Sequence, residues 1–231
     1  MAPADLRIDP ALAEEVVFRA ARMPDAGAVA ATYEARRAAL YHAPLTPEAR
    51  NAAFEQLALR AFEEMGFTDT FRRRLDECPL LAGTVDLVMV QRAWTRKDER
   101  VELFVRERPA PLTSVLIAIQ AQRVLERARL IEFLRRELLH VADMCDPAFA
   151  YSPTPELGGS CQTDNDLIRD RFRLLWDAFV EARMRRWGWV APDDQRRDVA
   201  LQTPWADVMQ QETWTQSALL ALARSASYAH R

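Results

Sequence analysis

Four polar residues interrupt an apolar stretch of the chain at spacings that place them on one side of a helix. They are Arg136, Glu137, His140 and Asp143. Residues three and four positions apart share a helical face, so we expect one polar cluster beside an apolar stripe of Leu134, Leu138 and Val141. An imidazole can bind a metal ion, and a carboxylate can take a proton from water. This combination of residues points to metal-assisted hydrolysis.

Glu137 and His140 match the second half of the His-Glu-x-x-His pattern, in which two histidines bind zinc and the glutamate is the general base. The stretch resembles the zinc-binding helix of zincin metallopeptidases, and the order of expected elements over 85–187 is also similar to a zincin. Arg136 stands where the first histidine belongs, and a guanidinium has no lone pair to offer a metal. The resemblance therefore implies a zincin-like fold with a degenerate zinc motif.

In gluzincins, the zincins that this chain resembles in its later helix, a glutamate on that helix is the third zinc ligand. Asp177 and Glu181 lie one turn apart downstream of His140. In an active enzyme, the resemblance implies that His140, Glu181 and either Asp143 or Asp177 hold the metal while Glu137 activates water. The further candidate ligands are Asp146, Cys145 and Cys161.

The missing ligand favours a protein without zinc that is catalytically inactive and acts by binding an unidentified protein or peptide, or as a structural protein. An active zinc-dependent hydrolase with a non-standard ligand set is the first alternative. The second is a helical interaction domain unrelated to zincins, in which His140 is a hydrogen-bonded core residue. Because buried charges must be paired or bound to a metal, we expect Arg136 to bond Asp177 or Glu181 in place of zinc.

The composition is that of a folded protein, with 231 residues of which 49% are hydrophobic. The net charge of -3, from 31 basic and 34 acidic residues, favours neither nucleic acid nor an anionic membrane as a partner. No apolar run approaches the ~18 residues of a membrane span, and 1–30 lack a signal-peptide pattern. Three cysteines without a repeated spacing make no disulfide framework. We therefore expect a cytoplasmic location.

The N-terminal part, 1–80, carries clear helix signals. Asp9 followed by Pro10 predicts a helix that is capped by the aspartate and begins at the proline. Further helices are expected over 28–41, 46–66 and 69–77 from their apolar spacing and from Gly66, at which the second of these three ends.

The middle part, 85–187, contains β-prone runs at 85–90 and 101–105 that predict a hairpin packed on helices. A helical pattern then extends over 113–144, as one helix or as two that meet near 120–123, and a second long helix is expected over 166–187. The C-terminal part, 188–231, holds a last helix starting at Thr213 or Thr215. Without repeats or linkers, these parts predict a single domain that is mainly α with a small β-ribbon (α+β), the zincin-like helical domain.

Overall fold

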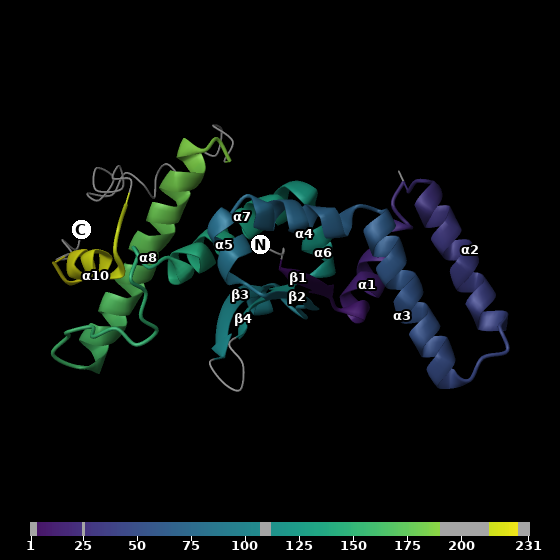
Figure 1. The fold of residues 1–231 in the computed structure, drawn as a ribbon, viewed down its shortest axis with the longest axis horizontal. Coiled ribbons are helices and arrows are strands. Elements are labelled where there is room, and N and C mark those ends of the chain that lie inside the picture. Colours follow the sequence, from purple (N-terminus) through teal and green to yellow (C-terminus); the bar gives the residue numbers. More distant parts are fainter. Residues whose placement is uncertain (1–3, 25, 107–111, 190–212, 226–231) are drawn as a thin grey trace. The chain divides into compact units, whose positions relative to one another are not determined.

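The computed structural model describes residues 4–24, 26–106, 112–189 and 213–225. Helices predominate among them, and the strands form one small sheet (Figure 1), so the predicted mainly α class with a small β component is confirmed. The chain divides into two compact units, Met1–Leu138 and Leu139–Arg231. The boundary falls inside α7 (Arg127–Cys145), and the single-domain organisation stays a prediction.

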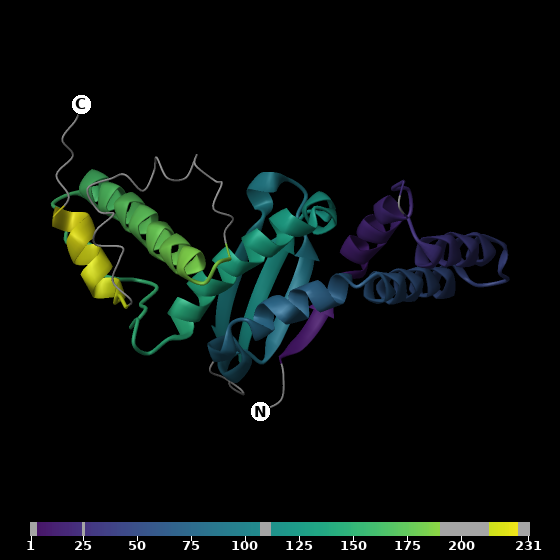
Figure 2. The ribbon, with the colours of Figure 1, turned by 90° about the horizontal axis from the view of Figure 1, so that it is seen from above.

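The first unit is built on a four-stranded mixed sheet in the order β1-β2-β4-β3. Its parallel strands are β1 (Asp5–Ile8), β2 (Leu87–Arg92) and β4 (Leu112–Ile119), and β3 (Arg100–Arg106) is antiparallel to β4 at the edge. Val88 is paired with Val115 and Val90 with Ile117, and all four are fully buried. Helix α4 and the first part of α7 lie over one face of the sheet (Figure 2).

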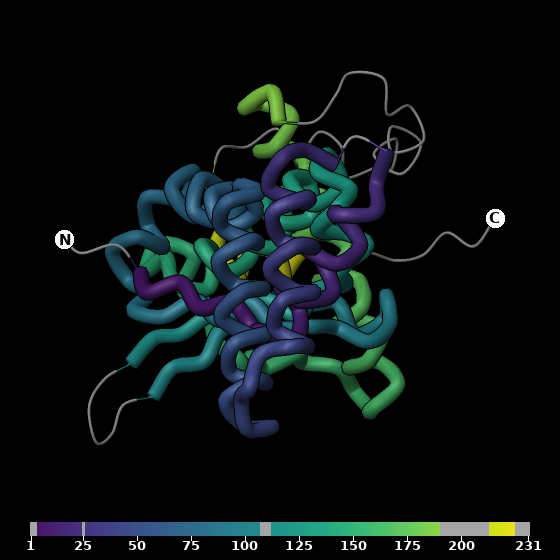
Figure 3. Tube along the Cα trace, turned by 90° about the vertical axis from the view of Figure 1, so that its right-hand side faces the viewer, coloured from purple at the N-terminus to yellow at the C-terminus, as the bar shows by residue number. Residues whose placement is uncertain are grey.

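Five helices separate β1 from β2. They are α1 (Pro10–Ala20), α2 (Ala28–His42), α3 (Pro47–Glu64), α4 (Phe67–Asp76) and α5 (Pro79–Thr84). The predicted caps are present, since Asp9 accepts from the Ala11 amide and Thr46 from the Ala49 amide. Helices α2 and α3 pack side by side as an antiparallel pair (Figure 3).

The predicted hairpin is wrong, because β2 and β3 do not pair with each other and β4 lies between them. A 3₁₀ turn, η1 (Arg96–Asp98), occupies the connection between β2 and β3. The residues from Thr113 to Ile119 are strand and not helix, and the helical part begins only with α6 (Ala121–Leu125) and α7. The run from Leu112 to Ile119 is almost wholly apolar because it forms an inner strand of the sheet, and such runs lack the alternation that marks a half-buried strand.

The second unit contains the end of α7, then α8 (Gln162–Arg186) and α10 (Gln216–Ser225), which packs on α8. Its core includes Leu175 and Met184 from α8 and Leu219 from α10, all buried. The Ala218 amide donates to Thr215, which agrees with the predicted start of the last helix. Much of the predicted C-terminal part, including Pro192 and Pro204, lies outside the described residues. Within the described ranges, none of the helices combines the length and apolar composition needed to cross a bilayer.

Candidate functional site

Helix α7 carries the predicted polar cluster and the predicted apolar stripe. Leu134, Leu138 and Val141 are buried, so the stripe is confirmed as core. The polar residues of the cluster lie on both sides of the boundary between the units, with Glu137 in the first unit and His140 and Asp143 in the second. Each unit therefore has its own set of contacts.

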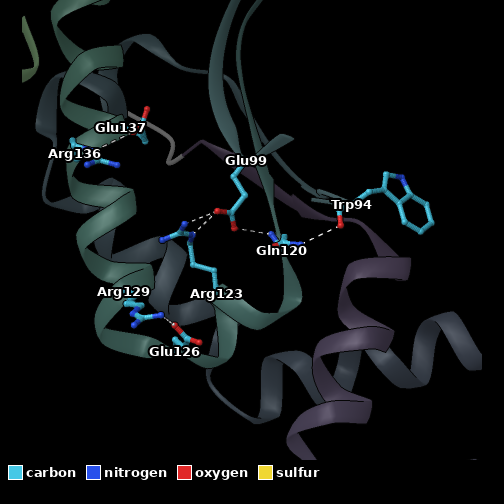
Figure 4. A network of polar contacts seen from close by, with 8 residues as sticks. All are labelled: Trp94, Glu99, Gln120, Arg123, Glu126, Arg129, Arg136 and Glu137. Atoms are coloured by element: carbon cyan, nitrogen blue, oxygen red, sulfur yellow. Dashed lines mark hydrogen bonds and ion pairs between the residues drawn. The ribbon is translucent and has the colours of Figure 1, made fainter. Parts of the chain in front are cut away.

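In the first unit, Glu137 forms an ion pair with its neighbour Arg136, whose Nε lies 3.3 Å from Glu137 Oε1 (Figure 4). The Arg136 side chain is 40% exposed and that of Glu137 25% exposed. Asp177 and Glu181 belong to the second unit, so the predicted pair of Arg136 with either of them stays a prediction. Arg136 and Glu137 are adjacent on the helix and can meet by rotation of their own side chains, so their ion pair does not depend on another element.

In the second unit, His140 lies against two consecutive residues of α8. Its Nε2 is 3.0 Å from Oδ1 of Asp177, and its ring meets that of Trp176 edge to face at 4.8 Å between centroids. The imidazole is 13% exposed, whereas the Asp177 side chain is 61% exposed. The histidine is thus a largely buried group whose carboxylate partner faces water.

Asp143, one turn after His140, is the most completely bonded carboxylate of the cluster. Arg183 of α8 donates from Nη1 to Oδ1 at 2.7 Å and from Nη2 to Oδ2 at 2.6 Å. The indole nitrogen of Trp176 also donates to Oδ2, at 2.7 Å. Asp143 is 6% and Arg183 15% exposed, so this is a buried, two-pronged pair of the kind that planar guanidinium groups make with carboxylates.

Aromatic rings fix the orientation of both donors. Phe149 stacks on Trp176 at 5.2 Å between ring centroids, while Tyr151 and Phe172 approach the same ring at 5.9 and 5.5 Å. The guanidinium of Arg183 lies over the Phe179 ring at 4.3 Å, a cation–π contact. The indole and the guanidinium are therefore held by packing as well as by hydrogen bonds.

The remaining candidate ligands have other roles. Glu181 lies 3.5 Å from Arg185 on its own helix, and Asp146 accepts from the Ala148 amide in the turn after α7. Burial raises the pKa of the Cys145 thiol, which disfavours the thiolate that metals bind, while Cys161 is exposed.

These contacts do not fit a zinc site. Both oxygens of Asp143 already accept N–H groups, two of them from a permanent cation, and His140 already has Asp177 as its partner. In the part of the chain that the structure describes, no group of three or more His, Cys, Asp or Glu side chains could hold a metal ion. The arrangement instead offers hydrogen bonding between the end of α7 and α8.

The sequence pattern does not identify the partners of Asp143. Trp176 and Arg183 are seven residues apart and so share one face of α8, with Phe179 between them. That spacing is the one feature of the sequence that could have indicated a shared partner for Trp176 and Arg183, although an arginine on a largely polar helix is usually solvent-exposed.

Comparisons of the chain with protein-family models, with curated proteins and with solved structures found no match.

Proposed function

We propose that this chain is a catalytically inactive protein of zincin-like ancestry that acts by binding a protein or peptide partner or as a structural protein. The observation that carries the proposal is the buried contact of Asp143 with Arg183 and Trp176. A metal bound at Asp143 would have to displace this cation, and breaking a buried ion pair typically costs about 3–5 kcal/mol. The protein thus neutralises a candidate ligand with its own side chain.

The surroundings of Glu137, the candidate general base, also argue against catalysis. Glu137 shares its helix with Arg136 in the position of the missing histidine, and the two side chains form an ion pair. A general base acts on a water that is held and polarised, which in zinc peptidases is the work of the metal and its three protein ligands. Glu137 has one histidine one turn away and an arginine beside it.

One contact favours the alternative of an active metal-dependent hydrolase. The Nε2 of His140 and the exposed carboxylate of Asp177 are 3.0 Å apart, and both groups are of types that bind zinc. Asp177 faces water, so rotation of its side chain could admit a metal between the two. Under this alternative, Glu137 remains the residue that activates water.

Hydrolysis assays distinguish the two functions. Full-length protein incubated with zinc is tested on a mixed peptide library read by mass spectrometry, with Glu137→Gln as the matched control. The proposal predicts cleavage no faster than in the Glu137→Gln sample, because any residual signal then comes from contaminating peptidases. Cleavage in the wild type that Glu137→Gln removes would overturn the proposal and establish the hydrolase.

A further inference from the structure

A second polar feature lies in the first unit, far along the sequence from the α7 cluster. Residues that follow the carboxyl ends of the three parallel strands meet around a pocket of about 280 Å³. β2 ends in Arg92, Gln120 follows the end of β4, and α1, which follows β1, contributes Glu15 and Arg19. Ligands of open α/β sheets commonly bind outside the carboxyl ends of the strands.

The charges in this pocket favour an anion. Glu15 forms ion pairs with both arginines, at 2.6 Å to Arg19 and 3.5 Å to Arg92. The single negative charge of Glu15 balances only one of the two arginines, so these three side chains together carry a net charge of about +1. Arginine forks suit the planar oxygens of carboxylates and phosphates.

Trp94 supplies a flat apolar surface beside these charges. Its side chain is 75% exposed, the largest exposure among the large hydrophobic residues of the described chain. The guanidinium of Arg92 lies 3.8 Å from the centroid of its ring, which covers one face. Tryptophan and arginine are enriched among the residues that carry most of the binding energy at interfaces.

The loop that carries Trp94 is held in place by a network of polar contacts (Figure 4). The Gln120 side chain donates to the Trp94 carbonyl at 3.1 Å, and the Gln120 amide donates to Glu99 at 3.2 Å. The Glu99 side chain, 3% exposed, also accepts from Arg123 through Nε at 2.8 Å. Thr95 and Asp98 close the turn between them with a capping box. In Figure 4 the indole of Trp94 points away from this network, so the loop presents it to solvent.

From these observations we infer that the pocket binds a small planar anion, a ring bearing a phosphate or carboxylate group. The ring stacks on Trp94 and the anionic group contacts Arg92 and Arg19. A flat ring can bind here without hydrogen bonds to its edge, because stacking on an aromatic side chain involves only the face of the ring. The inference does not depend on the function proposed for the α7 cluster.

Calorimetric titration of the full chain tests this inference with four probes. Adenosine monophosphate and 2-naphthoate each carry a ring and an anionic group, whereas adenosine lacks the charge and inorganic phosphate lacks the ring. We expect at least one of the first two to bind with a Kd of ~1 mM or tighter, and whichever binds identifies the phosphate or the carboxylate source. Adenosine and inorganic phosphate should bind about tenfold more weakly.

Variants locate the binding. Trp94→Ala and Arg92→Gln should each weaken it about tenfold, Trp94→Phe should retain most of it, and Trp187→Ala, at an exposed tryptophan of the second unit, should leave it unchanged. Circular dichroism checks that each variant is folded. Failure of both ring-bearing anions to bind, equal binding of adenosine or phosphate, or full affinity in Trp94→Ala would overturn the inference.

Discussion

Asp143 on α7 and Arg183 on α8 form a buried ion pair with two parallel hydrogen bonds of 2.6 and 2.7 Å. The pair shows how the chain satisfies a carboxylate that its sequence places in an apolar helix. Trp176 completes the set by donating its indole N–H. No metal is needed to compensate the charge at this position, which is the basis of the proposed function.

Removing one partner of this pair should be strongly destabilising. Arg183→Met leaves Asp143 buried without its cation, and we expect the free energy of unfolding to fall by about 3–5 kcal/mol. The double variant Asp143→Leu with Arg183→Met should recover most of that loss, because the charge is then absent too. Urea denaturation followed by circular dichroism gives both values. A loss below ~1 kcal/mol in Arg183→Met would mean that the pair is not formed.

The contact between His140 and Asp177 should contribute much less to stability. Asp177 is 61% exposed, and exposed ion pairs typically contribute about 0–1 kcal/mol. Asp177→Asn is therefore expected to lower the free energy of unfolding by no more than about 1 kcal/mol, in contrast to Asp143→Asn, which alters the buried pair. Equal losses in the two variants, measured under the same urea conditions, would contradict this ranking.

Glu99 is predicted to keep the Trp94 loop in one conformation. The hydrogen bond from Arg123 to Glu99 raises the pKa of Arg123 and marks a strong interaction with a nearly buried carboxylate. Glu99→Gln removes that charge and should cost roughly 1–3 kcal/mol. Amide hydrogen exchange at residues 93–99 should speed up in this variant.

Glu126→Gln is the matched control for Glu99→Gln. Glu126 accepts from the side chains of Gln122 and Arg129 at the surface, where such contacts add little stability. We expect no change in exchange at residues 93–99 in this variant. Faster exchange there in both variants would show that the effect is not specific to Glu99.

The cysteines should differ in reactivity. Burial raises the pKa of the Cys145 thiol, so at pH 8 it holds less of the reactive thiolate than an unperturbed cysteine does. Its alkylation by iodoacetamide should be slower than that of exposed Cys161 and should accelerate as the pH rises toward the raised pKa. Because the folded state disfavours the thiolate, the stability linked to the neutral thiol is present at low pH and is lost as the pH rises through that pKa. Peptide mass spectrometry over time measures the rates, and equal rates at pH 8 would contradict the assignment.

The sequence predicts the helices with local capping signals far better than it predicts the sheet. Asp9 and Thr46 accept hydrogen bonds where their sequence positions require, because a cap depends only on residues within one turn. The pairing of β2 with β4 depends on residues far apart in the chain, and no local pattern specifies that β4 lies between β2 and β3. The short strand β1, held by its pairing with β2, was not expected for the same reason.

The sequence predicts that charged residues in α7 need partners, but it does not identify those partners. The expectation that buried charges in α7 must be compensated is met at Asp143, whose cation is Arg183 of α8. Arg183 could not be singled out from the sequence, because its contact with Asp143 depends on the packing of Trp176 and its neighbouring rings, which is a property of the folded unit. The sequence does not indicate that Trp94 is exposed, because the conformation of its loop depends on the contacts of Gln120 with Glu99 and with the Trp94 carbonyl.

Metal content shows whether zinc binds at the α7 cluster, which the proposed function excludes. Tag-free wild type, Arg136→His and Arg129→His are incubated with zinc, separated by gel filtration and measured by mass spectrometry. Arg129 lies on α7 with its side chain 71% exposed, so Arg129→His controls for zinc held by a surface histidine. We expect no stoichiometric zinc in the wild type or in Arg129→His, and zinc in Arg136→His would support a zincin ancestry. One zinc per chain in the wild type would contradict the proposed absence of zinc and establish a non-standard ligand set.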